Sequence, residues 1–206
     1  MSELFVGPDG RPRCRWAGGA PELLDYHDHE WGRPVTDDRR LFEKLSLEAF
    51  QSGLSWRTIL AKRDHFRAAF SNFEIDEVAA FDGADVERLL GDAGIVRHRG
   101  KIEAVVNNAA RARELIDREG SLAAFVWSYE PDEAMPPEPQ TRSTSPESVS
   151  LSKELKKRGW RFVGPTTVFA FMQAMGLLND HARDCVVRAD AERERGGLVR
   201  PPHQPA

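Results

Sequence analysis

Apolar residues recur along this chain at every third or fourth position, as on one face of a helix. The longest stripe of this kind begins at Ile102 and continues to Ile116, and a second one follows Ser55 from Trp56 to Phe70. No segment shows the sustained alternation of apolar and polar residues that a half-buried strand requires. The pattern therefore predicts an all-α protein.

Capping residues and glycines define the ends of the predicted helices. Thr36 or Asp37 can cap a helix that continues to about Gln51, and Gly53 can end it. Further helices are predicted at 75–81, at 84–90, from 102 to just before Gly120, at 121–127, at 145–158 and from Thr166 or Thr167 to Leu178.

Other segments lack the helical pattern and suggest a domain organisation. Prolines interrupt residues 130–146, which we interpret as a connection over the surface or an ordered loop across a site. Residues 188–206 are charged and then rich in glycine and proline, so we expect a disordered tail. This leaves a flexible N-terminus at 1–12 and one domain at 13–187, with a candidate hairpin at 90–102.

Length and composition indicate a globular protein that does not enter a membrane. The chain has 206 residues, of which 40% are hydrophobic and 30% are charged, enough for a core. Its apolar runs are far shorter than the roughly 20 residues that cross a bilayer, and it lacks a secretion signal. We therefore expect a soluble, cytoplasmic protein. Because the net charge is −4, any nucleic-acid site must be a local basic patch.

Two cysteines and two histidines form a candidate metal site. His181 precedes Cys185 by four positions, which on a helix would place the imidazole and the thiolate on one face. Cys14 and His27 would complete a Cys₂His₂ set suited to tetrahedral zinc, and four protein ligands make such a site structural. The alternatives are two buried cysteines with surface histidines, or a single disulfide.

Aromatic residues are concentrated in the first quarter of the chain, at Trp16, Tyr26, Trp31 and Trp56. They either fill the core or form the walls of a pocket for a planar heterocycle. A cationic heterocycle would suit such a pocket best, because ring faces attract cations.

Glu48 is a polar residue that could complete such a pocket. On a helical wheel begun at Leu41, Glu48 lies at the edge of the apolar face. A buried carboxylate is costly unless it is paired, so Glu48 either belongs to a structural ion pair or is kept for function. Lys44, one turn earlier, is available as the partner.

The link at residues 90–102 joins two predicted helices and has a glycine at each shoulder. The second helix presents its N-terminal amides at Gly100, and Arg97, Arg99 and Lys101 add three positive charges. Such a helix-hairpin-helix can bind a DNA phosphate backbone without reading its sequence. An ordinary corner between two helices, with solvated basic residues, is the alternative.

Several strings of residues, together with this link, resemble a known family. They are Cys14-Arg15-Trp16, YHDHEWG at 26–32, LEAFQSGLSW at 47–56 and Asn179-Asp180-His181. From Arg13 to Cys185 the chain is similar to the type I 3-methyladenine DNA glycosylase family. The resemblance implies an α-helical DNA-repair glycosylase of the helix-hairpin-helix superfamily.

The resemblance also implies roles for the candidate residues. Glu48, Tyr26, Trp56 and Trp16 would form the base pocket, with Trp31 as a further candidate. The metal would be one structural zinc per chain, held by Cys14, His27, His181 and Cys185 and joining the two ends of the chain.

The expected reaction is hydrolysis of the N-glycosidic bond of 3-methyladenine in double-stranded alkylated DNA. The damaged base would first flip out of the duplex. Its hydrolysis from the sugar would then release the free base and leave an abasic site. Glu48 would act as hydrogen-bond acceptor and counter-charge, and the chain is expected to be a monomer. One alternative is a bifunctional glycosylase/lyase in which Lys101 forms a Schiff base. The other is a non-catalytic, zinc-stapled binder of damaged DNA.

Overall fold

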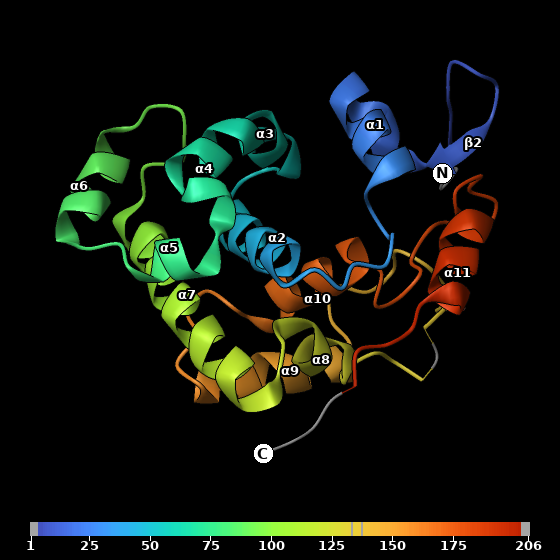
Figure 1. The fold of residues 1–206 in the computed structure, drawn as a ribbon. Helices are drawn as coiled ribbons and strands as arrows, with labels where there is room; N and C mark the ends of the chain where they lie inside the picture. Colours follow the sequence, from blue (N-terminus) through green and yellow to red (C-terminus); the bar gives the residue numbers. More distant parts are fainter. Residues whose placement is uncertain (1–3, 133, 137, 203–206) are drawn as a thin grey trace.

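The computed structural model describes residues 4–132, 134–136 and 138–202, and helices dominate it (Figure 1). The helices are α1 (Pro21–His29), α2 (Asp38–Gln51), α3 (Trp56–Ala61), α4 (Arg63–Ala69), α5 (Ile75–Ala79), α6 (Gly83–Gly91), α7 (Arg99–Glu119), α8 (Leu122–Trp127), α9 (Pro146–Lys157), α10 (Pro165–Ala174) and α11 (Arg188–Gly197), with short 3₁₀ helices η1 (Arg15–Gly19) and η2 (Ser71–Phe73). The mostly helical fold agrees with the predicted class. None of the described helices is long and apolar enough to cross a membrane.

Helix α2 lies at the centre of the fold and determines where the site can form (Figure 1). Its N-cap is Asp37, one of the two candidates from the sequence, whose carboxylate accepts a hydrogen bond of 2.8 Å from the backbone amide of Arg40. Every residue from 41 to 50 is buried, because α3, α7, α8 and α10 all pack around this helix. Polar side chains on α2 must therefore find partners inside the protein.

Two predicted helices end earlier than their apolar stripes suggest. The stripe from Trp56 to Phe70 is divided between α3 and α4, which meet at Lys62. The last apolar helix ends at Ala174, because the chain reverses at Gly176 with a φ of 74°. A Cβ atom on Gly176 would lie 2.6 Å from the backbone of Arg33, so this close approach requires glycine.

The N-terminal segment is ordered where the structure describes it, so the predicted flexibility of residues 1–12 is wrong from residue 4 onward. Strands β1 (Leu4–Val6) and β2 (Pro12–Cys14) form an antiparallel hairpin, the one departure from an all-helical chain among the described residues. Arg13 holds the hairpin through ion pairs of 2.7 Å with Asp9 and 2.9 Å with Asp28. Residues 1–3 lie outside the described range.

The predicted disorder of residues 188–206 is also wrong for the described part of that segment. The turn that precedes helix α11 is joined to the N-terminal hairpin, because the amide of Val186 donates a hydrogen bond of 2.9 Å to the carbonyl of Pro12. Arg195 of α11 is buried and forms an ion pair of 2.6 Å with Glu130. A charged residue such as Arg195, which suggested a solvated tail, is thus neutralised by a partner that is distant in the sequence. Residues 203–206 lie outside the described range.

Candidate functional site

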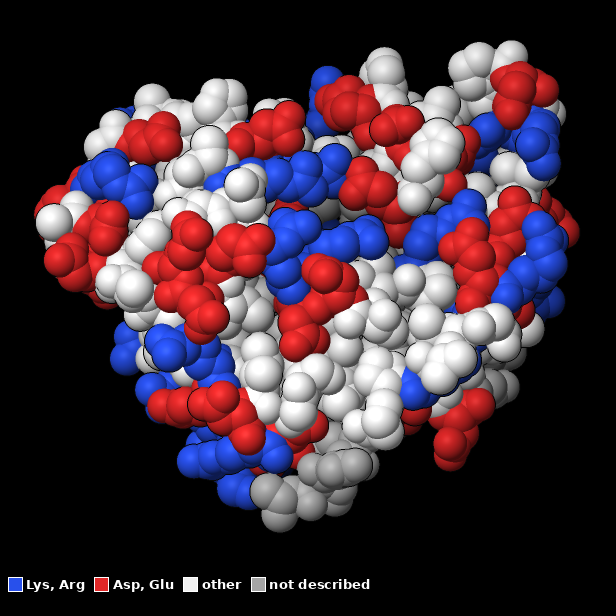
Figure 2. Space-filling model, viewed as in Figure 1, with Lys and Arg blue, Asp and Glu red and all other residues white. Residues whose placement is uncertain are grey.

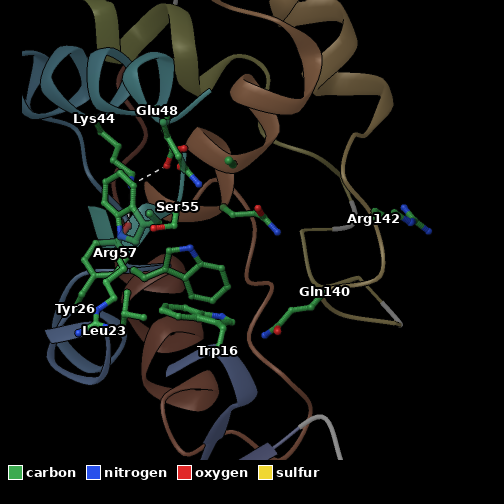
Figure 3. Close-up of a pocket in the computed structure, with 14 residues that line it drawn as sticks. Trp16, Leu23, Tyr26, Lys44, Glu48, Ser55, Arg57, Gln140 and Arg142 are labelled. Atoms are coloured by element: carbon green, nitrogen blue, oxygen red, sulfur yellow. Dashed lines mark hydrogen bonds and ion pairs between the residues drawn. The ribbon is translucent and has the colours of Figure 1, made fainter. Parts of the chain in front are cut away.

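A cavity of about 400 Å³ opens beside α1, α2 and α3. Its lining includes the four aromatic residues singled out in the sequence and Glu48, namely Trp16, Tyr26, Trp31, Trp56 and Glu48. The structure therefore brings together, from four separate segments, all of the residues predicted to form a pocket (Figure 3).

The aromatic rings form two tilted pairs along the cavity. Trp16 and Trp31 meet edge to face with ring centroids 5.1 Å apart, and Tyr26 and Trp56 are tilted at 5.2 Å. Tyr26 and Trp31 are buried, with 4% and 9% of their surfaces exposed, whereas Trp16 and Trp56 are partly exposed. In this arrangement a planar ligand could contact both faces and edges of the aromatic rings.

Glu48 forms a buried ion pair inside the cavity. The Glu48 Oε1 atom lies 2.7 Å from Lys44 Nζ, one turn earlier on α2, and both side chains are almost fully buried. The Lys44 ammonium also donates a hydrogen bond of 2.8 Å to Tyr26 Oη and lies 3.2 Å from the ring centroid of Trp56. The structure shows the ion pair that the first interpretation of Glu48 predicted, and it places the same carboxylate on the cavity lining.

Burial sets the protonation of the groups around this ion pair. It lowers the pKa of Lys44 below its ordinary value, and the neighbouring Glu48 carboxylate opposes that shift. Burial also raises the pKa of Tyr26 well above its ordinary value, and the negative charge of Glu48 adds to the effect. Tyr26 is therefore a neutral phenol that can donate a hydrogen bond.

The proline-rich segment 130–146 contributes residues that the sequence analysis did not identify. Gln140 and Arg142 line the cavity from this loop, opposite α2 (Figure 3). Asp180 fixes the loop, because its carboxylate accepts a hydrogen bond of 2.9 Å from the backbone amide of Gln140. Of the two interpretations of this segment, an ordered loop across a site is the one the structure supports. Residues 133 and 137 within it lie outside the described ranges.

The predicted metal ligands are also brought together. The donor atoms of Cys14, His27, His181 and Cys185 all lie within 4.8 Å of one another, and all four residues are buried. Both cysteines are free thiols, so the alternative of a disulfide is excluded. Residues 181–185 form bends and turns and not the helix that the four-residue spacing would suit, so the thiol and imidazole converge through a different local geometry.

Two of the thiol–imidazole separations in this cluster fit a tetrahedral zinc ion. Zinc with ligand bonds of about 2.0–2.3 Å separates its ligand atoms by roughly 3.3–3.8 Å. Cys14 Sγ lies 3.6 Å from His181 Nδ1, and Cys185 Sγ lies 3.5 Å from His27 Nε2. The other ring nitrogen of His27 lies 2.8 Å from a carboxylate oxygen of Asp28, the kind of contact that orients a histidine ligand.

The predicted phosphate-binding residues of the link between α6 and α7 have different environments. Arg97 is exposed, and Arg99 is exposed but forms an ion pair of 2.6 Å with Glu87. Gly100 lies in the first turn of α7, as predicted.

Lys101 is buried, and its ammonium donates hydrogen bonds of 2.9 Å and 2.6 Å to the carbonyls of Phe50 and Ser52. The prediction that Lys101 contacts phosphate is wrong, because the end of α2 attracts its ammonium inward.

Charges on the surface give no single basic face in the view of Figure 2. Basic and acidic side chains are interspersed over it. Any contact with a polyanion on this face must therefore be local.

Comparison with known proteins gives consistent results along most of the chain. Residues 16–189 match a family model described as methyladenine glycosylase. DNA-3-methyladenine glycosylase 1 of Escherichia coli K12 is 47% identical over 177 residues, which cover 84% of this chain and 95% of that protein.

Solved structures agree in fold. A crystal structure of 3-methyladenine DNA glycosylase I matches with a TM-score of 0.80 at 45% identity, covering 84% of this chain and 98% of the other. The crystal structure of a variant of 3-methyladenine DNA glycosylase I in complex with 3-methyladenine matches with a TM-score of 0.78 at 36% identity, covering 91% and 98%.

Proposed function

This chain belongs to the methyladenine glycosylase family, and from that premise we propose how its residues act on alkylated DNA. The protein is a monofunctional DNA-3-methyladenine glycosylase, which hydrolyses the N-glycosidic bond and releases the free base. The observation that carries the proposed site is the cavity that combines four aromatic side chains with the Glu48 carboxylate.

The cavity suits a methylated purine that has left the DNA duplex. A base must be flipped out of the stack before an enzyme can reach its glycosidic bond, and a poorly paired base costs less to extrude. Methylation at N3 gives the adenine of a nucleotide a positive charge. Trp16, Tyr26, Trp31 and Trp56 would contact its ring faces and edges, and Glu48 would accept a hydrogen bond and supply counter-charge. Ordinary adenine lacks this charge and would bind more weakly.

The chemical step needs little from the protein beyond positioning. As the bond between C1′ of the sugar and N9 of the base breaks, its electron pair goes to N9. The base then leaves as neutral 3-methyladenine without being protonated. A water molecule forms the new bond to C1′ and loses a proton to solvent.

A structural zinc ion is part of the proposal. Cys14, His27, His181 and Cys185 would hold it, and the ion would supply only a rigid link between the two ends of the chain. The same segments carry pocket walls, because Trp16 follows Cys14 by two residues and Tyr26 directly precedes His27. The zinc ligands would thereby keep the aromatic walls in place.

We place the DNA backbone at the start of α7, where Arg97, Arg99 and the amide of Gly100 would contact phosphates in a helix-hairpin-helix manner. Lys101 has no such role, and its ammonium is held by two carbonyls, which disfavours the Schiff base of a lyase. The monomeric state and cytoplasmic location predicted from the sequence remain part of this proposal.

Base release from methylated DNA tests the function directly. The protein is incubated with duplex DNA treated with a methylating agent, and the released bases are separated by chromatography. We expect free 3-methyladenine from methylated DNA and no adenine from untreated DNA. Binding of methylated DNA without base release would instead support the non-catalytic alternative. A covalent adduct trapped with borohydride would support the lyase.

A further inference from the structure

A buried ammonium lies inside the pocket that is proposed to receive a cationic base. Lys44 Nζ is 2.7 Å from Glu48 Oε1, 2.8 Å from Tyr26 Oη and 3.2 Å from the ring centroid of Trp56. Figure 3 shows Lys44 and Glu48 descending together from α2 toward the aromatic side chains, joined by a dashed line. Lys44 therefore occupies one of the positions where the pocket would attract a positive charge.

The carboxylate of Glu48 is already balanced by an ammonium before a base enters the pocket. Glu48 on the same helix neutralises Lys44, while Tyr26 of α1 and Trp56 of α3 are neutral groups packed against it. Glu30, at the end of α1, and Arg63 of α4 are further charges that act on Lys44, and they neutralise each other through an ion pair of 2.6 Å. Arg57 and Arg142 also line the cavity, and Arg57 forms an ion pair of 2.7 Å with Glu22. Glu48 is thus not a free negative charge waiting for a cation.

This balance matters because the charge of the substrate moves during the reaction. The methylated base is positive before the glycosidic bond breaks and neutral afterwards, and the positive charge passes to the sugar. A lone carboxylate beside the base would stabilise the bound substrate more than the transition state and would slow the departure of the base. An ammonium beside the base has the opposite effect, because it favours the arrival of the electron pair on the base.

We propose that Lys44 is a charge-balancing, specificity-determining residue that offsets Glu48, so that the pocket can recognise a methylated base without anchoring its positive charge. Glu48 contributes the hydrogen-bond acceptor, and Lys44 removes the excess attraction that the carboxylate would otherwise exert on the bound cation. This inference rests on the proposed function of the pocket and adds a determinant of its rate.

Single-turnover kinetics of Lys44→Met on methylated duplex DNA test the proposal. Methionine is also unbranched and keeps the contact with Trp56, but it leaves Glu48 uncompensated. We expect a lower half-saturating enzyme concentration and a slower limiting rate of base release, each by roughly tenfold for one charge at this range. A purely structural role would not tighten binding and slow base release in the same variant.

The double variant Lys44→Met/Glu48→Gln keeps the test valid even if the single variant folds poorly, because it leaves no unpaired charge. Its limiting rate should exceed that of Lys44→Met, since no uncompensated carboxylate remains beside the base. A matched control is Lys101→Met, which removes another buried ammonium that faces the end of α2 and not the cavity. It should lower the melting temperature without the opposed changes in affinity and rate.

The outcomes distinguish this inference from the function on which it rests. If the wild type releases no 3-methyladenine, the proposed function and this inference fail together. If the wild type is active and Lys44→Met shows an unchanged rate, a faster rate, or weaker binding with a slower rate, only this inference is overturned. A double variant no faster than Lys44→Met would overturn it as well.

Discussion

Replacing Glu48 with glutamine separates the structural from the functional contribution of its carboxylate. The change keeps the shape of the side chain and a hydrogen-bond acceptor toward Lys44 Nζ, 2.7 Å away, but removes the counter-charge. Breaking a buried ion pair costs about 3–5 kcal/mol when the remaining charge has no other partner. Lys44 keeps its contacts with Tyr26 and Trp56, so we expect a smaller loss of about 2–3 kcal/mol.

The stability loss should depend on pH in a direction fixed by Lys44. Its pKa in the folded protein is already lowered by burial, and the loss of Glu48 removes the charge that opposes this shift. The unfolded chain then binds more protons than the folded one between the two pKa values, so the stability of Glu48→Gln rises with pH across that interval. The difference in the free energy of unfolding between Glu48→Gln and the wild type is therefore largest below the folded-state pKa of Lys44 and becomes smaller above it.

Melting and base excision measured on the same Glu48→Gln sample check both expectations. For a chain of this length, 2–3 kcal/mol corresponds to a drop of about 4–12 °C in melting temperature. Excision per folded molecule at subsaturating enzyme should fall as well, because the ammonium of Lys44 is then uncompensated and repels a cationic base. The matched control is Glu43→Gln, a buried carboxylate of the same helix that pairs with Arg67 outside the cavity. It should lose stability but keep excision per folded molecule.

Two results would refute this reasoning. An unchanged melting temperature across pH would mean that the ion pair contributes nothing to stability. Full excision by folded Glu48→Gln would mean that the carboxylate does not face the substrate.

Three further changes test other parts of the structure. We expect one zinc ion per chain, and Cys185→Ser should lose it and melt at a lower temperature. Metal analysis and melting of the purified proteins check this. A wild type that contains no metal and is as stable as Cys185→Ser would contradict the prediction. Arg97→Ala should weaken binding to damaged and undamaged DNA alike and flatten the salt dependence of binding by up to about one unit. Lys101→Ala should leave the salt slope unchanged, because its ammonium is buried. Equal salt slopes for Arg97→Ala and the wild type would mean that the DNA backbone does not bind at Arg97. Gly176→Ala should destabilise the fold by more than about 1 kcal/mol, measured by denaturant titration. The reason is that a Cβ atom would lie 2.6 Å from the backbone of Arg33 and that φ is 74° at this position. An unchanged free energy of unfolding would show that the turn relaxes.

Helix positions with local signals were predictable from the sequence. Four capping side chains each accept a hydrogen bond from the backbone amide three positions later, namely those of Asp37, Ser55, Ser121 and Ser145. The three serines were predicted to open their helices, and Asp37 was one of two candidates, with Thr36. Helix α1 was missed, because Ala20 precedes it and provides no side-chain cap.

In the candidate site too, residues with a local sequence signal could be predicted, and residues placed by long-range contacts could not. Glu48 could be found because the helical wheel places it on a face that other helices cover. Gln140 could not be found, because its place depends on Asp180, 40 positions away, and its own segment has no periodicity. Helix α11 was missed for the same reason, since the partner of Arg195 is Glu130.

The candidate metal site and the base pocket share structural elements, which explains why a structural ion would matter for a reaction in which it takes no part. The second ring nitrogen of His181, Nε2, lies 3.2 Å from the backbone carbonyl of Trp31, a position that suits donation of a hydrogen bond. Its Nδ1 is then free to face the sulfur of Cys14 as a ligand. The rings of Trp31 and His181 also meet edge to face at 4.7 Å, and those of Trp16 and His27 at 5.1 Å. Two pocket walls thus rest directly on two proposed zinc ligands, so movement of the ligands would displace the rings that contact the base.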